Sequence, residues 1–206
     1  LVRLSLGLLG DGPAALCAAI AFGVVCYAGL LLALILPMLA VFSGGCFWCT
    51  ESDFDKLPGV VETLSGYTGG EAETADYQQV SAGGTDHIES VAVFFDPTKT
   101  SYAELVEAFW PTIDPLTANA QFCDHGYQYS SAVYYVNDEQ KALLESSRDA
   151  LEARFDEPIH TLILPRQPFY AAEDYHQDYY EKNPLRYTFY RTTCGRDARL
   201  EEIWGD

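Results

Sequence analysis

The segment Gly44-Gly45-Cys46-Phe47-Trp48-Cys49 constrains this chain more than any other. The apolar run that ends at Phe42 predicts a buried strand, and residues 46–56, followed by Pro58-Gly59, predict a short helix. The two glycines permit a sharp turn between them. Cys46 therefore stands at a helix start, where unpaired N–H groups and the helix dipole favour the thiolate. We expect an ionised nucleophile beside aromatic side chains, the alternative being a small buried cysteine in a turn.

Composition limits the classes of function open to these 206 residues. A formal net charge of −18 argues against binding to a phosphate backbone, so we expect no nucleic-acid partner. Residues 13–42 carry no charge, and residues 14–36 are long enough for a membrane anchor or an uncleaved leader, the alternative being an extension without such a role. We therefore expect a hydrophobic leader or anchor at 1–40 and a single catalytic domain at 41–206. The protein would be membrane-anchored or exported if the leader acts as one, and cytoplasmic otherwise.

Periodicity and stop signals predict the order strand, helix, strand, strand, helix, strand in the first part of the domain. The four strands are expected to end near Ser43 and to cover 60–67, 87–95 and 131–136, and the two helices to cover 46–56 and 101–110. This order is typical of the ferredoxin-like fold, an α+β sandwich with helices on one face of a sheet. The remaining expected elements are a surface loop at 68–84, a helix at 137–155, a short strand at 159–164, a polar helix at 172–182 and a coil tail.

A carboxyl group and two phenols accompany the cysteine as candidate catalytic groups. Glu89 lies on a strand face otherwise made of valine and phenylalanine, so we expect a desolvated carboxyl with a raised pKa that can act as an acid. Tyr77 and Tyr129 can donate hydrogen bonds to an oxygen that gains charge, and Asp124 lies near the second of them. With the thiolate of Cys46, these groups suit a neutral, polarised substrate whose oxygen leaves as water. A glutamate at an exposed sheet edge and tyrosines without a role are the alternatives.

Five collinear blocks of sequence point to a known family. They are residues 44–48 (Gly-Gly-Cys-Phe-Trp), 66–70 (Gly-Tyr-Thr-Gly-Gly), 85–89 (Thr-Asp-His-Ile-Glu), 124–131 (Asp-His-Gly-Tyr-Gln-Tyr-Ser-Ser) and 174–179 (Asp-Tyr-His-Gln-Asp-Tyr). In these blocks the chain resembles the A-type peptide methionine sulfoxide reductases, from Ser43 to about Pro184. The Gly-Cys-Phe-Trp core is highly specific for that family.

The resemblance implies a role for each candidate. Cys46 attacks the sulfur of methionine sulfoxide and Glu89 protonates the sulfoxide oxygen, which leaves methionine and a sulfenic acid on the cysteine. Tyr77 and Tyr129 hold that oxygen, with Asp124 nearby. An aromatic pocket for the substrate methyl group would set a preference for the S epimer, in free or protein-bound methionine sulfoxide. The pocket residues that the resemblance implies are Phe47, Trp48 and Tyr179.

Three cysteines are candidates for resolving the sulfenic acid. Cys194 is the first choice, because the family often carries its recycling cysteine on the C-terminal tail. Cys49, where the family usually has glycine, is the second, because Cys-x-x-Cys at a helix start is used by thiol–disulfide exchangers. Cys123, where the family often has asparagine, is the third, because Asp124 brings its loop near the site. Thioredoxin or a similar dithiol would then reduce the disulfide, and we expect a monomer without bound cofactor or metal.

Other interpretations fit parts of the sequence. A thiol–disulfide oxidoreductase would use Cys46 and Cys49 and would need neither Glu89 nor the tyrosines. A Cys-His hydrolase would use His87, for which a structural role in the strand is the simpler expectation. A membrane module built around the leader does not explain the five blocks. A structural zinc site would combine Cys46, Cys49, Cys123 and Cys194.

Overall fold

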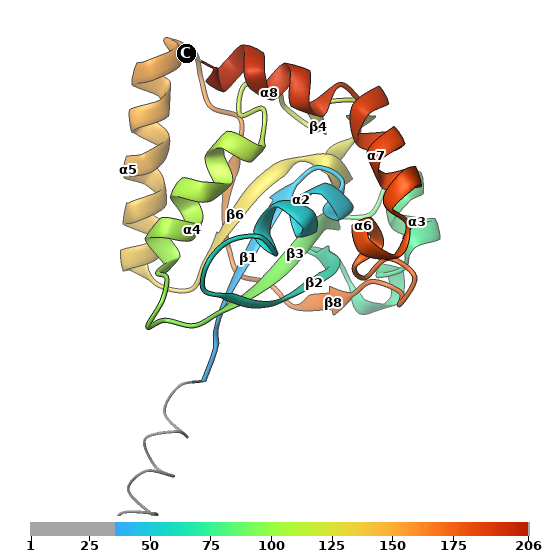
Figure 1. Cartoon of the computed structure of the whole chain (residues 1–206). Helices are drawn as coiled ribbons and strands as arrows, with labels where there is room; N and C mark the ends of the chain where they lie inside the picture. Colours follow the sequence, from blue (N-terminus) through green and yellow to red (C-terminus); the bar gives the residue numbers. More distant parts are fainter. Residues whose placement is uncertain (1–35, 206) are drawn as a thin grey trace, which may run out of the picture. The chain divides into compact units, whose positions relative to one another are not determined.

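The computed structural model describes residues 36–205, which form a large sheet, a small two-stranded sheet and a set of helices (Figure 1). The large sheet has the order β7-β6-β1-β3-β2-β8. Its strands are β1 (Met38–Gly44), β2 (Val60–Thr68), β3 (Ile88–Phe95), β6 (Ser131–Tyr135), β7 (Leu162–Pro165) and β8 (Phe169–Ala171). The small sheet pairs β4 (Ala120–Gln121) with β5 (Asp124–His125). All neighbours in the large sheet are antiparallel except β6 and β7, so the domain is an α+β structure with a mixed sheet.

Helices α2 (Phe47–Phe54), α4 (Tyr102–Phe109) and α5 (Asp138–Phe155) lie over one face of the sheet (Figure 1). Side chains alternate across a strand, so β1 serves two cores. Phe42 packs into the larger core beneath these helices, where its ring lies 5.2 Å from that of Phe109. Val41 belongs to a smaller cluster that includes Tyr134. Burial on both faces explains why β1 has a continuous apolar sequence.

The helix boundaries expected from capping signals are confirmed. The hydroxyl of Ser101 accepts a hydrogen bond from the backbone N–H of Glu104, and the side chain of Glu104 accepts one from the backbone N–H of Ser101, so a complete capping box opens α4. Asn137 accepts from the backbone N–H of Gln140 at 2.8 Å and opens α5. The other predicted strands and helices of the βαββαβ segment are present within a few residues of their expected limits. Since β1 begins at Met38, residues 38–40 belong to the sheet rather than to a leader.

The C-terminal tail is helical, and the prediction of coil is wrong. Residues 184–193 form α7 (Pro184–Thr193) and residues 196–204 form α8 (Arg196–Trp204). Long-range contacts fix both helices. Tyr187 is buried, Arg196 donates to the carbonyl oxygens of Gly44 and Thr112 at 3.1 and 2.7 Å, and the indole of Trp204 donates to the carbonyl of Ile113 at 2.9 Å. Such tertiary contacts override weak local periodicity.

Two further predictions need correction. The segment expected as a surface loop at 68–84 contains a short helix, η1 (Ala72–Thr74), and α3 (Tyr77–Ala82), which Asp76 caps by accepting from the backbone of Gln79. The helix expected at 172–182 is reduced to α6 (Tyr179–Lys182), because residues 174–178 form a turn around the buried His176. Two other short helices complete the described structure, η2 (Trp110–Thr112) and η3 (Tyr127–Tyr129).

The expected leader lies almost entirely outside the described residues, which begin at position 36. This applies to residues 14–36 as a possible anchor. Within residues 36–205, every helix is too short or too polar to cross a membrane.

Candidate active site

The turn between β1 and α2 has the geometry that the sequence predicts. Gly45 has a φ of +82°, and a Cβ on it would lie only 2.5 Å from the Cβ of Gln121, so glycine alone fits this position. Cys46 is the residue that precedes α2, and its carbonyl accepts from the backbone N–H groups of Cys49 and Thr50 at 3.1 and 3.3 Å. β1 and β3 are antiparallel, and the register that places Phe42 opposite Val91 brings the start of β3, with Glu89, to the same turn.

A small cavity of about 60 Å³ opens at this turn. Its lining consists of Cys46, Phe47, Trp48, Tyr77, Glu89, Asp124, Tyr129 and Tyr190. All five predicted catalytic residues are in this set, and so are both aromatic residues that follow the cysteine. The cavity is thus large enough to admit a small group and has both polar and aromatic walls.

Glu89 is the buried carboxyl of the cavity. It is 2% exposed and accepts a hydrogen bond from the backbone N–H of Phe47 at 3.1 Å. Burial raises the pKa of Glu89 to about 8, and the hydrogen bond from Phe47 offsets only part of this effect. The carboxyl is therefore largely protonated at pH 7.

A hydrogen bond links Cys46 to Cys49, and the pKa values of the two thiols shift in opposite directions, which the sequence does not predict. Burial raises the pKa of Cys46 well above its ordinary value, and a hydrogen bond with Cys49 and the charges of Glu89 and Asp124 raise it further. The hydrogen bond from Cys46 lowers the pKa of Cys49 to about 7, and Arg196 assists. The expectation of an ionised Cys46 is thus wrong for the free protein, because desolvation outweighs the helix terminus. At neutral pH the thiolate form is therefore favoured on Cys49 rather than on Cys46.

Two phenols reach the cavity from separate elements. Tyr77 is the first residue of α3, and Tyr129 ends η3, which follows Gly126 with a φ of +126°. Burial and the charge of Glu89 raise the pKa of both hydroxyls, that of Tyr77 to about 12. Both groups therefore keep their protons at neutral pH and can donate hydrogen bonds to an oxygen in the cavity.

Tyr190 is a cavity residue that sequence reasoning missed. It lies on α7, in the segment expected as coil, and its hydroxyl donates a hydrogen bond to the carboxylate of Asp124. Burial, together with the charges of Cys46 and Asp124, raises the pKa of this phenol. Only the helical spacing of aromatic residues in 184–193 could have signalled a packed face here, and it does not reveal what the face contacts.

Trp48 is held in place by residues outside the cavity. Its ring stacks on Tyr179 with centroids 3.8 Å apart, and its indole N–H donates to Nδ1 of His176 at 3.0 Å. Tyr179 therefore supports the wall of the cavity from behind, whereas the sequence places it in the pocket itself. His176 belongs to the 174–179 block but was not singled out by sequence reasoning.

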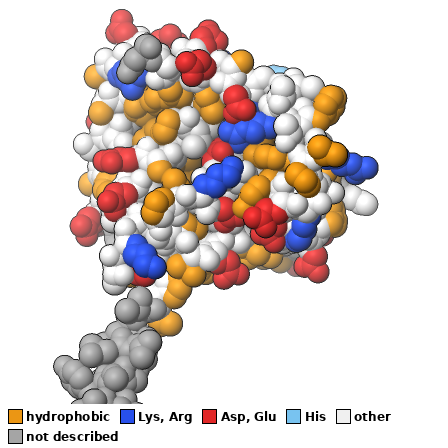
Figure 2. Space-filling model, viewed as in Figure 1, with side chains coloured by type: hydrophobic (Ala, Val, Ile, Leu, Met, Phe, Trp, Pro, Cys, Tyr) orange, Lys and Arg blue, Asp and Glu red, His pale blue; other side chains and the backbone are white. Residues whose placement is uncertain are grey.

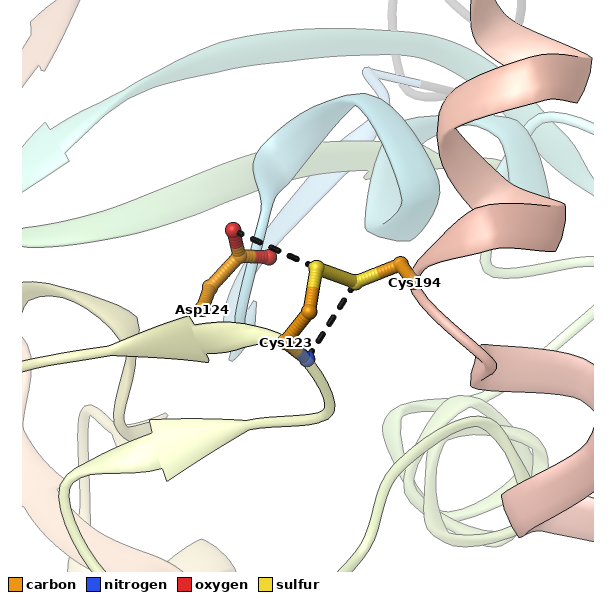
Figure 3. Close-up of side chains that lie close together, drawn as sticks. All are labelled: Cys123, Asp124 and Cys194. Carbon is orange, nitrogen blue, oxygen red and sulfur yellow. Dashed lines mark hydrogen bonds between the residues drawn. A yellow bond between two sulfur atoms is a disulfide. The ribbon is translucent and has the colours of Figure 1, made fainter.

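The cysteines form two separate pairs. Cys123 and Cys194 are joined in a disulfide beside Asp124 (Figure 3), whereas Cys46 and Cys49 are free and buried. Among the described residues, the sulfur and carboxylate ligand atoms close enough to share a metal ion are those of Cys123, Asp124 and Cys194. This group lacks Cys46 and Cys49, so the four cysteines do not assemble the zinc site considered above.

Comparisons with known proteins agree with this geometry. Residues 38–206 match the family model described as peptide methionine sulfoxide reductase. The chain is 48% identical to the enzyme MsrA of Bacillus velezensis, over 82% of this chain and 96% of that protein. It is 46% identical to MsrA 2 of Rhizobium meliloti, over 82% of this chain and 85% of that protein.

Solved structures give the same result. Reduced Mxr1 of Saccharomyces cerevisiae is similar with a TM-score of 0.68 and 33% identity, covering 73% of this chain and 87% of Mxr1. Methionine sulfoxide reductase A of Corynebacterium diphtheriae is similar with a TM-score of 0.65 and 34% identity, covering 72% of this chain and 76% of that protein. The chain thus belongs to the peptide methionine sulfoxide reductase family, and it is an oxidoreductase that reduces methionine sulfoxide to methionine.

Proposed function

We propose that Cys46 and Glu89 carry out the reduction of methionine-S-sulfoxide, with the substrate sulfur in the 60 Å³ cavity. The observation that carries this proposal is that the backbone N–H of Phe47, directly after Cys46, donates to Glu89, so nucleophile and acid are held at one turn. The sulfur of Cys46 forms a bond to the sulfoxide sulfur while Glu89 gives its proton to the sulfoxide oxygen. The substrate S–O bond and the new S–S bond then break as the hydroxyl group passes to the sulfur of Cys46, which releases methionine and leaves a sulfenic acid on Cys46.

Cys49 takes part in both halves of this reaction. The hydrogen bond between the two cysteines supports transfer of the Cys46 proton to Cys49 as the sulfur attacks. Afterwards Cys49 attacks the Cys46 sulfenic acid, an S–S bond forms, the S–O bond breaks and water leaves. Two cysteines thereby supply the two electrons that the sulfoxide accepts.

The remaining cavity residues position the substrate. Neutral phenols at Tyr77 and Tyr129 donate to the sulfoxide oxygen, and Asp124 fixes the arrangement through Tyr190. The rings of Phe47 and Trp48 accept the methyl group, which selects the S epimer. We also class the core as ferredoxin-like, since the order β6-β1-β3-β2 and its antiparallel pairing support that description.

The pairing of cysteines favours Cys49 over Cys194 as the resolving residue. Cys49 lies beside Cys46, whereas Cys194 is already bonded to Cys123. Thioredoxin or a similar dithiol then reduces the Cys46–Cys49 disulfide by exchange. Cys194 and Cys123 become resolving residues only if their own disulfide is first reduced.

Mass spectrometry after one turnover without reductant tests the route. Incubation with the S-sulfoxide should give one equivalent of methionine and a new Cys46–Cys49 disulfide, with Cys123–Cys194 unchanged. A disulfide from Cys46 to Cys194 would contradict the proposed route. The Cys49→Ser variant should still release methionine once and should retain the sulfenic acid.

The alternative function is thiol–disulfide exchange through Cys46 and Cys49, which the shared proton of this pair favours. Disulfide reduction in insulin, measured in the wild type and in Glu89→Gln, separates the two activities. Sulfoxide reduction should need Glu89, whereas disulfide exchange should not.

A further inference from the structure

A second hollow, of about 340 Å³, adjoins the catalytic cavity. Its lining residues are Trp48, Tyr77, Tyr175, His176, Tyr179, Asn183 and Arg186. Trp48 and Tyr77 line both spaces, so the hollow begins where the catalytic cavity ends. The cavity has room for only the end of a methionine sulfoxide side chain. The rest of the substrate must therefore lie outside the cavity, along the surface next to one of its walls.

Arg186 gives this hollow a charge. It lies on α7 four residues before Tyr190, so one helix face supplies a residue to each space. Within residues 36–205 the guanidinium of Arg186 makes no hydrogen bond or ion pair. We call this space, as defined by its seven lining residues, the Arg186 groove.

Two acidic side chains close in sequence to lining residues of the Arg186 groove have other partners. None of its lining residues is acidic within the described part of the chain. Glu173 accepts hydrogen bonds at 3.0 Å from the backbone of Tyr77 and from the hydroxyl of Tyr67. Asp178 pairs with Lys182 at 3.4 Å. The charge of Arg186 is thus available to a ligand.

We propose that the Arg186 groove binds a carboxylate of the substrate, carried next to the methionine sulfoxide. This inference rests on the reductase activity and names a class of preferred substrate. The carboxylate can belong to an aspartate or glutamate beside the oxidised methionine in a peptide, or it can be the α-carboxylate of free or C-terminal methionine sulfoxide. A guanidinium fork matches a carboxylate with two parallel hydrogen bonds, and the aromatic walls cover the apolar part of the neighbouring residue.

Long-range electrostatics act against this selectivity, so the test must isolate the local pair. The chain carries 30 acidic and 12 basic side chains, and the face in Figure 2 shows its basic groups scattered among acidic ones. This overall charge lowers the encounter rate of every acidic peptide in the same way. A comparison across both enzyme variants and peptide pairs cancels that common effect.

The experiment measures kcat and KM for the wild type and Arg186→Gln on matched blocked peptides. One pair carries Asp or Asn on either side of the S-sulfoxide, and a second pair offers C-terminal methionine sulfoxide as acid or as amide. For each enzyme we take the ratio of kcat/KM for the Asp peptide to kcat/KM for the Asn peptide. This ratio should be about two- to five-fold larger in the wild type than in Arg186→Gln, because an exposed ion pair contributes a free energy of that size. The difference should appear in KM. Arg186→Glu should reverse the preference towards a Lys-containing peptide. Arg166→Gln, an exposed arginine outside the groove, is the matched control and should behave as the wild type.

The outcomes separate this inference from the activity on which it depends. Equal Asp-to-Asn and acid-to-amide ratios in the wild type and both Arg186 variants would overturn the groove assignment while leaving the reductase intact. An effect limited to the Asp pair identifies an acidic neighbour in a peptide, and an effect limited to the acid–amide pair identifies the α-carboxylate. A wild type that fails to reduce the neutral amide peptide contradicts the reductase activity itself.

Discussion

The hydroxyl of Tyr190 donates a hydrogen bond to the carboxylate of Asp124, 66 residues earlier in the chain. Both residues line the cavity, and each has a disulfide-bonded cysteine nearby in sequence, Cys194 directly after α7 and Cys123 in the loop between β4 and β5. Helix α7 therefore supplies one wall of the cavity through Tyr190 and holds Asp124, which belongs to another wall. A segment that the sequence suggests to be coil thus lines the cavity in which we propose that the substrate binds.

The Tyr190→Phe variant should reduce kcat/KM by about three- to tenfold, chiefly by raising KM. Removal of the hydroxyl takes a hydrogen bond from a partly buried carboxylate, worth about 1 to 1.5 kcal/mol. Steady-state kinetics with a blocked S-sulfoxide peptide measure the effect. Tyr127→Phe, an exposed tyrosine outside the cavity, is the control. Unchanged kinetics in Tyr190→Phe would show that the hydrogen bond does not serve the site.

The Cys123→Ser/Cys194→Ser double variant should lose stability and keep its activity. The disulfide closes a loop with a sequence separation of 71, which corresponds to about 4 kcal/mol at most in the chain-entropy account. Other contacts still hold the C-terminal helices, including the ion pair between Arg191 and Asp53 at 2.9 Å. Urea unfolding should show a lower midpoint, and turnover with a chemical dithiol should remain within about twofold.

The contrast with Cys49 makes this second prediction specific. Cys49→Ser should leave urea unfolding of the disulfide-bonded protein close to that of the wild type and should abolish repeated turnover with a dithiol donor. If the Cys123→Ser/Cys194→Ser variant instead lost repeated turnover, Cys123 and Cys194 would belong to the recycling route.

Glu89 makes the rate of sulfoxide reduction depend on pH. Its pKa is raised to about 8 by burial, so the acid is protonated below that pH and loses its proton above it. We expect the single-turnover rate to fall as pH rises through about 8. Glu89→Gln should be slower by about 10²–10⁴-fold, and its rate should not fall as pH rises through about 8. A wild-type rate that stays constant from pH 7 to 10 would contradict the role of Glu89 as the acid.

A residue's position can be predicted from the sequence when it depends on neighbouring residues in the chain, and it cannot when it depends on contacts with distant segments. The alternation of β3 was enough to place Glu89 on an apolar face, and Gly45 was enough to place Cys46 at a turn. The position of Tyr190 depends instead on contacts between α7 and a loop distant in sequence, which no local window contains. The protonation of Cys46 likewise could not be predicted, because it depends on how deeply the turn is buried and on the neighbouring Cys49.

Glu51 should make the stability of the fold depend on pH. Its side chain is fully buried, and neither carboxyl oxygen has a hydrogen bond of full geometry among the described residues, although the backbone N–H of Asp178 and the hydroxyl of Ser65 lie close enough to offset part of the effect of burial on its pKa. Burial raises its pKa from 4.5 to about 7, so the folded state holds this proton more tightly than the unfolded state. The stabilisation from this proton is complete below pH 4.5 and is lost as pH rises through about 7.

The Glu51→Gln variant tests this linkage. Its stability should lack the contribution that declines between about pH 4.5 and 7, because glutamine does not ionise. At pH 8 it should be more stable than the wild type by up to about 3 kcal/mol, the free energy that corresponds to the pKa shift. Urea unfolding at pH 5, 6, 7 and 8 gives the two curves, with Glu139→Gln on the exposed side of α5 as the control. Parallel curves for Glu51→Gln and the wild type would mean that Glu51 keeps an ordinary pKa in the folded protein.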